Sequence, residues 1–258
     1  MATMLLEICG LTKKFGGLQA LSDFNVGLEE GSATALIGPN GSGKTTAFNL
    51  ASGFYKPTSG TIRFAGQDIR ALKPHEITAL GMARTFQNIR LWQDMTVLDN
   101  IRISQHYCLG YSIWDCFLWT RRFRGREREI DRHAYEMLEC MGLMDYAQEY
   151  PRNLPYGLQR RVEIARAMSV RPRLLLLDEP AAGLNSADVG DLIQLIRWLR
   201  TEFKDLTIWM IEHQMRVVMS LCSTIKVIDF GRTIAEGPPE VIQSDPNVIK
   251  AYLGDENI

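Results

Sequence analysis

The residues best suited to chemistry form a glycine-rich run that ends in a lysine and threonines. Residues 38–45 read G-P-N-G-S-G-K-T and fit the pattern G-x-x-x-x-G-K-[ST] at every fixed position. In such a run, backbone N–H groups can surround phosphate oxygens, Lys44 can contact them, and Thr45 can offer its hydroxyl to Mg²⁺. The run therefore predicts a site for a nucleoside triphosphate. Its candidate binding residues are Gly38, Pro39, Asn40, Gly41, Ser42, Gly43, Lys44, Thr45 and Thr46.

Two carboxylates follow an apolar run further along the chain. The run Leu174–Leu177 precedes Asp178 and Glu179, and the carboxyl ends of parallel strands face the ligand crevice of an open sheet. We expect Asp178 to hold Mg²⁺ and Glu179 to orient or deprotonate an attacking water. Acidic residues also occur at solvated strand exits, but the glycine-rich run favours the functional interpretation. A glutamate beside the aspartate also favours hydrolysis over phosphoryl transfer to a second substrate, because the glutamate supplies a base for water.

The elements that must position these groups alternate between strands and helices. Apolar residues 33–37 predict a buried strand directly before the glycine-rich run, and residues 44–52 can form a helix after it. Strands that alternate with helices predict an α/β fold with a mostly parallel sheet. Further strands are expected at 5–11, 18–26, 61–64, 174–177 and 207–211, and helices after Gly157, after Asn185 or Ser186, and from Pro246.

Composition limits the class of protein. The 258 residues are 46% hydrophobic and 23% charged, with a net charge of −1, which argues against disorder, a coiled-coil rod and a broad nucleic-acid-binding face. The five cysteines are scattered without a C-x-x-C pair, so we expect reduced thiols. No apolar run approaches the roughly 18 residues that a membrane span requires.

The middle of the chain differs from both ends. Residues 97–144 carry little strand signal, and we expect a helical subdomain at 96–170 inserted between 1–95 and 171–258 of the α/β core. Its aromatic residues favour a subdomain core, while a groove for a helix of a membrane subunit is the alternative. These residues are Tyr107, Tyr111, Trp114, Phe117, Trp119 and Phe123, with Leu118 at the same helical spacing.

A basic run follows these aromatic residues. Residues 121–132 contain six arginines together with Glu127, Glu129 and Asp131. A solvated helix face with internal ion pairs is the favoured interpretation. Contact with acidic lipid headgroups is the alternative.

An ordered set of motifs resembles the ATP-binding-cassette (ABC) ATPases over the whole chain. The segment Leu154–Arg161, L-P-Y-G-L-Q-R-R, is similar to their L-S-G-G-Q signature, and it lies ahead of the acidic pair as in that family. The other members of the set are Phe15, the glycine-rich run, Gln87, residues 182–185 and His213. The resemblance implies one ABC ATPase domain over 1–258, with a P-loop NTPase core, an N-terminal antiparallel β region and an inserted helical subdomain.

The resemblance also implies roles for single residues, with ATP and Mg²⁺ as cofactors. Phe15 is similar to the aromatic residue that stacks on adenine. The alternative is that Phe15 is a core residue, which would give the same sequence pattern. Gln87 resembles the glutamine that senses Mg²⁺ and the attacking water, and His213 the histidine that contacts the γ-phosphate. Gly157 lies where the signature faces a nucleotide, and Asn185 lies where the family touches the opposite subunit.

The signature departs from the family pattern at three positions. Pro155 replaces the serine, Tyr156 the first glycine and Leu158 the glutamine, while Gly157 remains. A serine hydroxyl would contribute about 1.5–3 kcal/mol through a hydrogen bond to a charged phosphate. The absence of this hydroxyl affects how much the signature half-site contributes to nucleotide binding across a dimer.

Family resemblance extends to partners and cargo. It implies a second ABC ATPase subunit, transmembrane permease subunits, an indirectly coupled periplasmic binding protein, no nucleic acid, and a peripheral place on the cytoplasmic face of the inner membrane. The tail 235–254 and the long interval between Gln87 and Leu154 are similar to the LivG-type ATPases of branched-chain amino-acid importers. Alternatives are a motor for urea or amide import or lipopolysaccharide export, and a soluble ABC ATPase acting on nucleic acid.

Overall fold

The chain divides into two compact units. The computed structural model describes residues 3–108 and 112–253. Unit 1 combines Met1–Gln87 with Arg173–Ile258, and unit 2 is Asn88–Pro172. The helix-rich middle of the sequence is therefore a separate unit, and in the sequence it lies between the two segments of unit 1.

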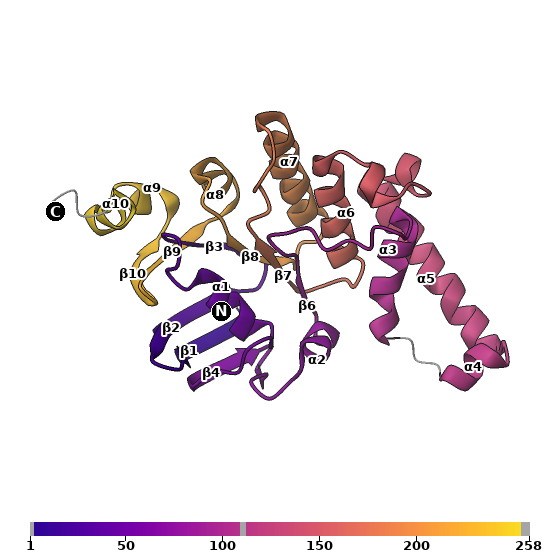
Figure 1. The fold of residues 1–258 in the computed structure, drawn as a ribbon, viewed down its shortest axis with the longest axis horizontal. Helices are drawn as coiled ribbons and strands as arrows, with labels where there is room; N and C mark the ends of the chain where they lie inside the picture. The colour runs from indigo at the N-terminus through magenta and orange to yellow at the C-terminus, as the bar shows by residue number, and fades with distance from the viewer. Residues whose placement is uncertain (1–2, 109–111, 254–258) are drawn as a thin grey trace. The chain divides into compact units, whose positions relative to one another are not determined.

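Three largely apolar runs form the centre of a six-stranded sheet in unit 1. Strands β3 (Ala33–Ile37), β7 (Leu174–Asp178) and β8 (Thr207–Ile211) are buried at every position, as expected for parallel strands covered on both faces. The spatial order is β10-β9-β3-β8-β7-β6, and β10 alone runs antiparallel to its neighbour (Figure 1). The mostly parallel sheet is thus confirmed. Its remaining strands are β6 (Met82–Arg84), β9 (Thr224–Asp229) and β10 (Arg232–Gly237).

A second, antiparallel sheet precedes it in the chain. Its order is β2-β1-β4-β5. Within it Phe24, Val26 and Leu28 are buried while the residues between them are exposed, so one face of β2 packs on the core and the other meets solvent. This sheet confirms the expected N-terminal antiparallel β region. The strands are β1 (Met4–Phe15), β2 (Leu18–Glu29), β4 (Ser59–Phe64) and β5 (Gln67–Asp68).

One hydrophobic core joins both sheets to the helix after the glycine-rich run. Helix α1 (Lys44–Ala51) buries Ala47, Phe48 and Leu50 among residues of both sheets. The ring of Phe48 lies 4.7 Å from that of Trp209 on β8, centroid to centroid. Since protein cores pack densely and deform little, this contact fixes the start of α1 and hence the loop before it.

The other helices of unit 1 follow the capping signals of the sequence. Asn185 accepts hydrogen bonds from the backbone N–H groups of Ala187 and Asp188, and so caps α7 (Ser186–Glu202). The predicted apolar stripe of α7 is buried, which confirms its orientation. The stripe consists of Val189, Leu192, Ile193, Ile196 and Leu199. The remaining helices are α2 (Pro74–Ala79), α8 (Met215–Leu221), α9 (Pro239–Gln243) and α10 (Pro246–Leu253).

Unit 2 is helical throughout its described residues. Its longest helix, α5, buries residues only from Ile130 onward, where Ile130 and Leu138 lie in the core. Arg102 of α3 forms an ion pair with Asp131 of α5, with Nε and Oδ1 2.7 Å apart, and so links the two helices. No helix among residues 3–108 and 112–253 is long and apolar enough to cross a bilayer. The helices are α3 (Val97–Ser104), η1 (Gln105–Cys108), α4 (Ile113–Phe117), α5 (Arg121–Cys140), η2 (Met144–Tyr146), η3 (Pro151–Asn153) and α6 (Tyr156–Met168).

The expected aromatic core of the helical insert is wrong in its central members. Trp114, Phe117 and Trp119 are 71%, 73% and 69% exposed, and Tyr111 lies outside the described residues. Their spacing does not belong to one helix either, because α4 is only five residues long and Trp119 has a φ of 47°. A helix this short presents no continuous stripe, so the periodic spacing did not produce burial.

Candidate active site

The glycine-rich run forms a tight loop between β3 and α1. Gly38 and Gly43 have φ angles of 151° and 106°. A Cβ atom on Gly38 would lie 2.0 Å from the carbonyl oxygen of Ile228, and one on Gly43 would lie 2.6 Å from that of Ala20. Only glycine fits at either position, because both the backbone angle and the space exclude a side chain.

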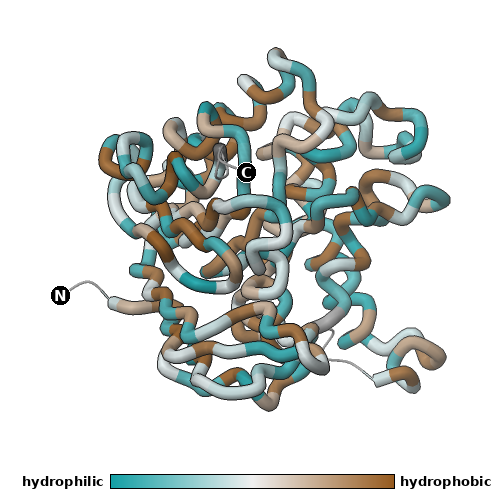
Figure 2. Tube along the Cα trace, turned by 60° about the vertical axis from the view of Figure 1, so that its left-hand side comes forward, coloured by the Kyte–Doolittle hydropathy of each residue, from teal (hydrophilic) through white to brown (hydrophobic). Residues whose placement is uncertain are grey.

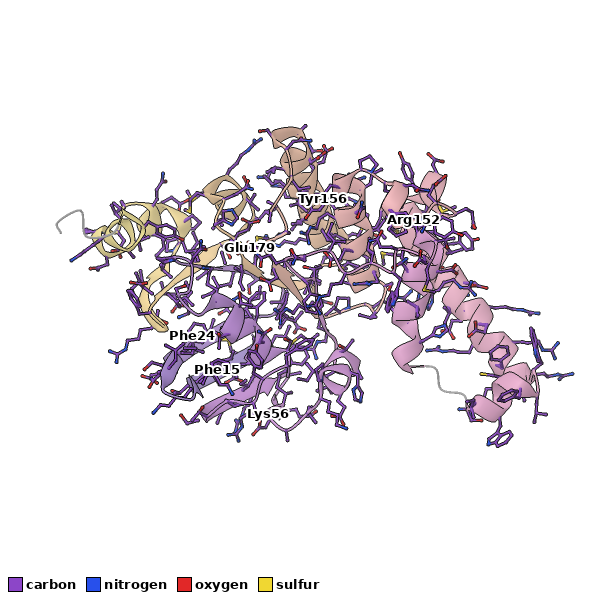
Figure 3. All side chains as sticks on the ribbon, in the orientation of Figure 1. Phe15, Phe24, Lys56, Arg152, Tyr156 and Glu179 are labelled. Carbon is purple, nitrogen blue, oxygen red and sulfur yellow. The ribbon has the colours of Figure 1, made fainter. Side chains whose placement is uncertain are left out.

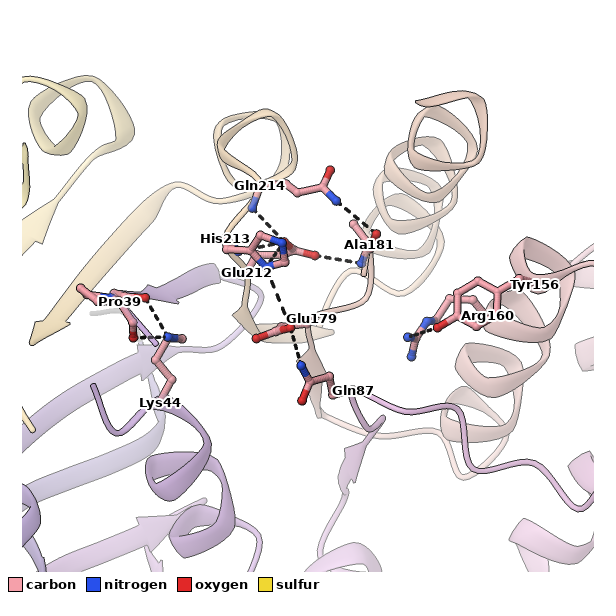
Figure 4. A network of polar contacts seen from close by, with 11 residues as sticks. Pro39, Lys44, Gln87, Tyr156, Arg160, Glu179, Ala181, Glu212, His213 and Gln214 are labelled. Atoms are coloured by element: carbon pink, nitrogen blue, oxygen red, sulfur yellow. Dashed lines mark hydrogen bonds and ion pairs between the residues drawn. The ribbon is translucent and has the colours of Figure 1, made fainter. Parts of the chain in front are cut away.

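Lys44 is held inside this loop. Its ammonium donates hydrogen bonds to the carbonyl oxygens of Gly38 at 2.7 Å and Pro39 at 2.8 Å (Figure 4). Burial lowers the pKa of Lys44, and the negative charges of Glu179 and Asp178 oppose that shift. The lysine charge therefore lies within the influence of both predicted catalytic carboxylates.

The loop has the properties of an anion site. The hydroxyl of Ser42 is buried and has no hydrogen-bond partner within the part of the chain that the structure describes, although buried polar groups are normally paired. The loop leads directly into the positive N-terminal end of α1. Thr45 is exposed and Thr46 half-buried in the first turn of that helix, and Asn40 and Gly41 are exposed on the loop. These features fit a bound triphosphate.

Glu179 is the centre of a polar cluster at the end of β7. Its φ of 48° is unusual for a residue other than glycine, and its backbone N–H donates to the carbonyl of Ile211 at 2.9 Å. Gln87 Nε2 donates to Glu179 Oε2 at 2.8 Å, and His213 Nδ1 lies 3.9 Å from the same oxygen (Figure 4). The structure thus brings together the three residues predicted to be catalytic.

The second carboxylate, Asp178, is held by a residue that the sequence analysis did not single out. Arg84 Nη2 donates to Asp178 Oδ2 at 2.8 Å, and both side chains are nearly buried. Arg84 Nη1 also donates to Asn49 and Ser52 of the α1 region, at 2.8 and 2.9 Å. An arginine before a loop gives no sequence signal for this contact, since the partners are distant in the chain. Arg84 therefore positions Asp178.

Removing Arg84 is expected to destabilise the fold strongly. Arg84→Met leaves Asp178 as a buried charge without its ion-pair partner, which costs about 3–5 kcal/mol in unfolding free energy. The melting temperature should fall by roughly 10 °C. Circular dichroism melting would measure this, and the double variant Arg84→Met/Asp178→Asn should recover much of the loss.

The exposed pair of Arg70 and Asp68 is the matched control. Its arginine donates to the carboxylate at 2.6 Å, but both side chains are more than two-fifths exposed. Arg70→Met should therefore change the melting temperature little, since solvent screens exposed pairs. A double variant no more stable than Arg84→Met alone would contradict the proposed role of the buried pair.

Glu212 is a further buried carboxylate that the sequence analysis left without a role. It is fully buried, and its oxygens accept hydrogen bonds from the backbone N–H groups of Ala181 at 2.8 Å, His213 at 2.9 Å and Gln214 at 3.0 Å. Gln214 also donates to the carbonyl of Ala181 at 3.2 Å. Glu212 thus joins the loop after Glu179 to the loop that carries His213 (Figure 4).

Phe15 lies at the surface of the antiparallel sheet rather than in the core. It is 41% exposed, its ring packs edge-on against Tyr55 with centroids 5.3 Å apart, and the Lys13 ammonium lies 4.8 Å from its centroid (Figure 3). The alternative of a core phenylalanine is therefore excluded. An exposed ring of this kind is available for stacking on a flat ligand.

Gly157 belongs to unit 2, where it is the second residue of α6. Pro155, which precedes this helix, provides no side-chain cap, as expected from the missing hydroxyl. Instead, Tyr156 accepts a hydrogen bond from Arg160 at 3.4 Å, and Arg160 forms a fully buried ion pair with Glu163 at 2.6 Å. The signature segment is thus held by α6 itself.

The C-terminal helix α10 approaches the glycine-rich loop, although no sequence pattern predicts this contact. Burial raises the pKa of Tyr252 on this helix, and the nearby backbone amide of Gly38 opposes that shift. A cavity of about 830 Å³ lies between loop and helix. It is lined by residues of both, including Pro39, Asn40, Gly41, Asn247, Lys250 and Ala251.

Two family models match the chain. The ABC transporter model matches residues 21–182, which include the glycine-rich loop and the acidic pair. The model described as branched-chain amino acid ATP-binding cassette transporter matches residues 232–257, which include β10, α9 and α10. The first model alone covers more than half of the chain.

Relatives and solved structures agree with these models. The chain is 47% identical to the high-affinity branched-chain amino acid transport ATP-binding protein BraF of Pseudomonas aeruginosa, over 99% of this chain and 100% of that protein. It is 44% identical to the corresponding LivG protein of Escherichia coli over the same shares. The ADP conformation of MJ1267, an ATP-binding cassette of an ABC transporter, is 30% identical with a TM-score of 0.83, over 98% of this chain and 100% of that one. The chain therefore belongs to the ABC transporter family, among its ATP-binding cassettes of branched-chain amino acid transporter type.

Proposed function

We propose that this chain hydrolyses ATP with Mg²⁺ and powers the import of branched-chain amino acids through separate permease subunits. The observation that carries the proposal is the cluster of Glu179, Gln87 and His213 in the same unit as the loop that holds Lys44. The names of the full-length relatives, which are branched-chain amino acid transport proteins, support the cargo.

The roles of the residues follow from their geometry. The backbone amides of residues 38–43 and the Lys44 ammonium bind the phosphate groups, and the exposed ring of Phe15 supports the base. The Glu179 carboxylate accepts a proton from the attacking water. Gln87 holds that carboxylate in place through a hydrogen bond, and His213, which lies beside the carboxylate, contributes a donor for phosphate oxygen.

The donor set also fits Mg²⁺, which prefers oxygen ligands and binds together with substrate phosphates. Thr45, Asp178 and Gln87 carry the oxygens that would hold it. When bound, Mg²⁺ neutralises charge on the phosphate oxygens. Arg84 keeps Asp178 in position and so preserves this donor set.

Partners are part of the proposal. Gly157 and α6 lie in unit 2, and we propose that they close over the loop of a second ABC subunit, so that ATP binding favours the closed pair and hydrolysis releases it. Phe15 and the loop would then form one half of a composite site. The assembly would lie on the cytoplasmic face of the membrane, bound to permeases that a periplasmic binding protein supplies.

Uptake in cells tests the proposal. In a strain whose only copy of this gene is deleted, uptake of radiolabelled leucine is expected to be lost. The wild-type gene should restore it, and a gene carrying Glu179→Gln should not. Glutamate uptake serves as the control and should not change. Unaltered leucine uptake, together with loss of urea uptake or of another solute, would assign a different cargo.

A further inference from the structure

Five large apolar side chains project from one end of unit 2. They are Ile113, Trp114, Phe117, Leu118 and Trp119, which we name the aromatic tip, and each is between 69% and 74% exposed. Helix α4 has no buried residue, and α5 has none before Ile130. Because soluble proteins rarely expose a contiguous group of this kind without a partner, the aromatic tip is a candidate interaction surface (Figure 1).

Polar caps, rather than a core, hold the aromatic tip in shape. The backbone N–H of Ser112 donates to Asp115 at 2.8 Å, and the hydroxyl of Thr120 donates to the same carboxylate at 2.9 Å. These hydrogen bonds lower the pKa of Asp115. Trp114 and Phe117 pack against each other with ring centroids 6.3 Å apart. The apolar side chains are therefore ordered but uncovered.

Positive charge is concentrated beside the aromatic tip. Arg121, Arg122 and Arg124 are exposed and form no ion pair within the described residues. Asp115 is the single acidic residue between 112 and 125. Further along α5 the charges are paired, as Arg126 is with Glu129 at 2.6 Å. The first turns of α5 thus carry uncompensated cations directly after the exposed aromatic residues.

This combination fits an anionic lipid surface. Tryptophan and phenylalanine prefer the interface between headgroups and acyl chains, and arginine pairs with lipid phosphates. The side chains of the tip are largely exposed, and a bilayer accepts exposed aromatic groups without a complementary shape. In Figure 2, the coil that follows the grey internal stretch 109–111 carries several hydrophobic residues, which are drawn in brown.

We propose that the aromatic tip inserts into the headgroup region of an anionic bilayer, where Arg121, Arg122 and Arg124 contact lipid phosphates. This surface would add a direct lipid contact to any contact with a permease. It goes beyond the proposed transport function, because lipid binding by the tip requires neither ATP nor a cargo.

Vesicle flotation of the purified full-length chain tests the proposal. The chain should bind vesicles of phosphatidylcholine with phosphatidylglycerol roughly 100-fold more tightly than vesicles of phosphatidylcholine alone, given three additional arginine contacts. Added salt should weaken this binding. The variants Trp114→Ala/Trp119→Ala and Arg121→Gln/Arg122→Gln/Arg124→Gln should each lose most of it.

Matched variants control for tryptophan content and net charge. Trp92→Ala removes a half-exposed tryptophan elsewhere in unit 2, and Arg63→Gln/Arg216→Gln/Arg232→Gln removes three exposed arginines of unit 1. Both should bind anionic vesicles as the wild type does, and unchanged circular dichroism would show that all variants fold. Glu179→Gln should also bind normally, which separates this proposal from the proposed function.

Two results would overturn the proposal. One is that the wild-type protein fails to float with anionic vesicles, even if its tip binds detergent-solubilised permease. The other is binding that the tip variants retain in full. The first would assign the tip to a protein partner, and the second would place lipid contact elsewhere on the chain.

Discussion

Glu179→Gln is expected to slow ATP hydrolysis by about 10²–10⁴-fold, the usual contribution of a positioned general base. The amide cannot accept the proton of the attacking water. It keeps the size of the carboxylate, however, and its oxygen can still accept the hydrogen bond from Gln87. ATP binding should therefore remain, and the closed dimer should accumulate because hydrolysis no longer releases it.

Phosphate release and equilibrium ATP binding measure the two halves of this prediction separately. Glu240→Gln, an exposed glutamate of α9, is the matched control and should hydrolyse ATP at the wild-type rate. Hydrolysis by Glu179→Gln at the wild-type rate would show that another group is the base. Loss of ATP binding in this variant would instead point to a collapsed site.

Lys44→Ala should weaken ATP binding by roughly 10- to 100-fold, because a hydrogen bond to a charged group contributes about 1.5–3 kcal/mol. The substitution removes the ammonium that we propose contacts the phosphates. It also leaves the carbonyl oxygens of Gly38 and Pro39 without their present donor. Titration calorimetry with Mg-ATP on the purified variant would measure the change in affinity.

Lys56 offers a matched control for this experiment. Its ammonium likewise donates to two backbone carbonyls, those of Arg70 at 2.8 Å and Leu72 at 2.9 Å, but it lies by the antiparallel sheet (Figure 3). Lys56→Ala should leave ATP affinity unchanged. If Lys44→Ala also bound Mg-ATP like the wild type, the glycine-rich loop would not be the triphosphate site.

Local sequence was sufficient for the centre of the fold. Strands β3, β7 and β8 are largely apolar runs with one polar residue each, and each strand is buried at every position. The loop after β3 was predictable because Gly38 and Gly43 have positive φ angles, and the backbone angles of a residue are a local property. The position of Glu179 followed from β7, since a parallel strand ends at the ligand edge of the sheet.

Strand β9 was not predicted, because a charged residue interrupts its apolar pattern. Lys226 is only 3% exposed, and its ammonium pairs with Glu236 on the neighbouring strand β10. The partner that makes burial tolerable lies on another strand. A single-strand pattern therefore argues against burial until the pairing of the two strands is known.

Long-range contacts explain the other omissions. Arg84 and Asp178 are 94 positions apart, so neither residue carries a local signal of the other. Glu212 reads as an ordinary polar residue beside His213, although its three backbone partners lie in two loops. The burial of Trp114 was wrongly predicted for the same reason. Helical spacing does not show whether another element packs against that face of the helix.

The cavity between α10 and the glycine-rich loop has a practical consequence for experiments on this protein. A purification tag or fluorescent fusion placed behind α10 would load a helix that lines the same cavity as the loop. Affinities measured on such a fusion would mix the properties of the label with those of the protein. Labels belong ahead of β1, and a fluorinated tyrosine at residue 252, near the Gly38 amide, would act as a spectroscopic reporter of the loop.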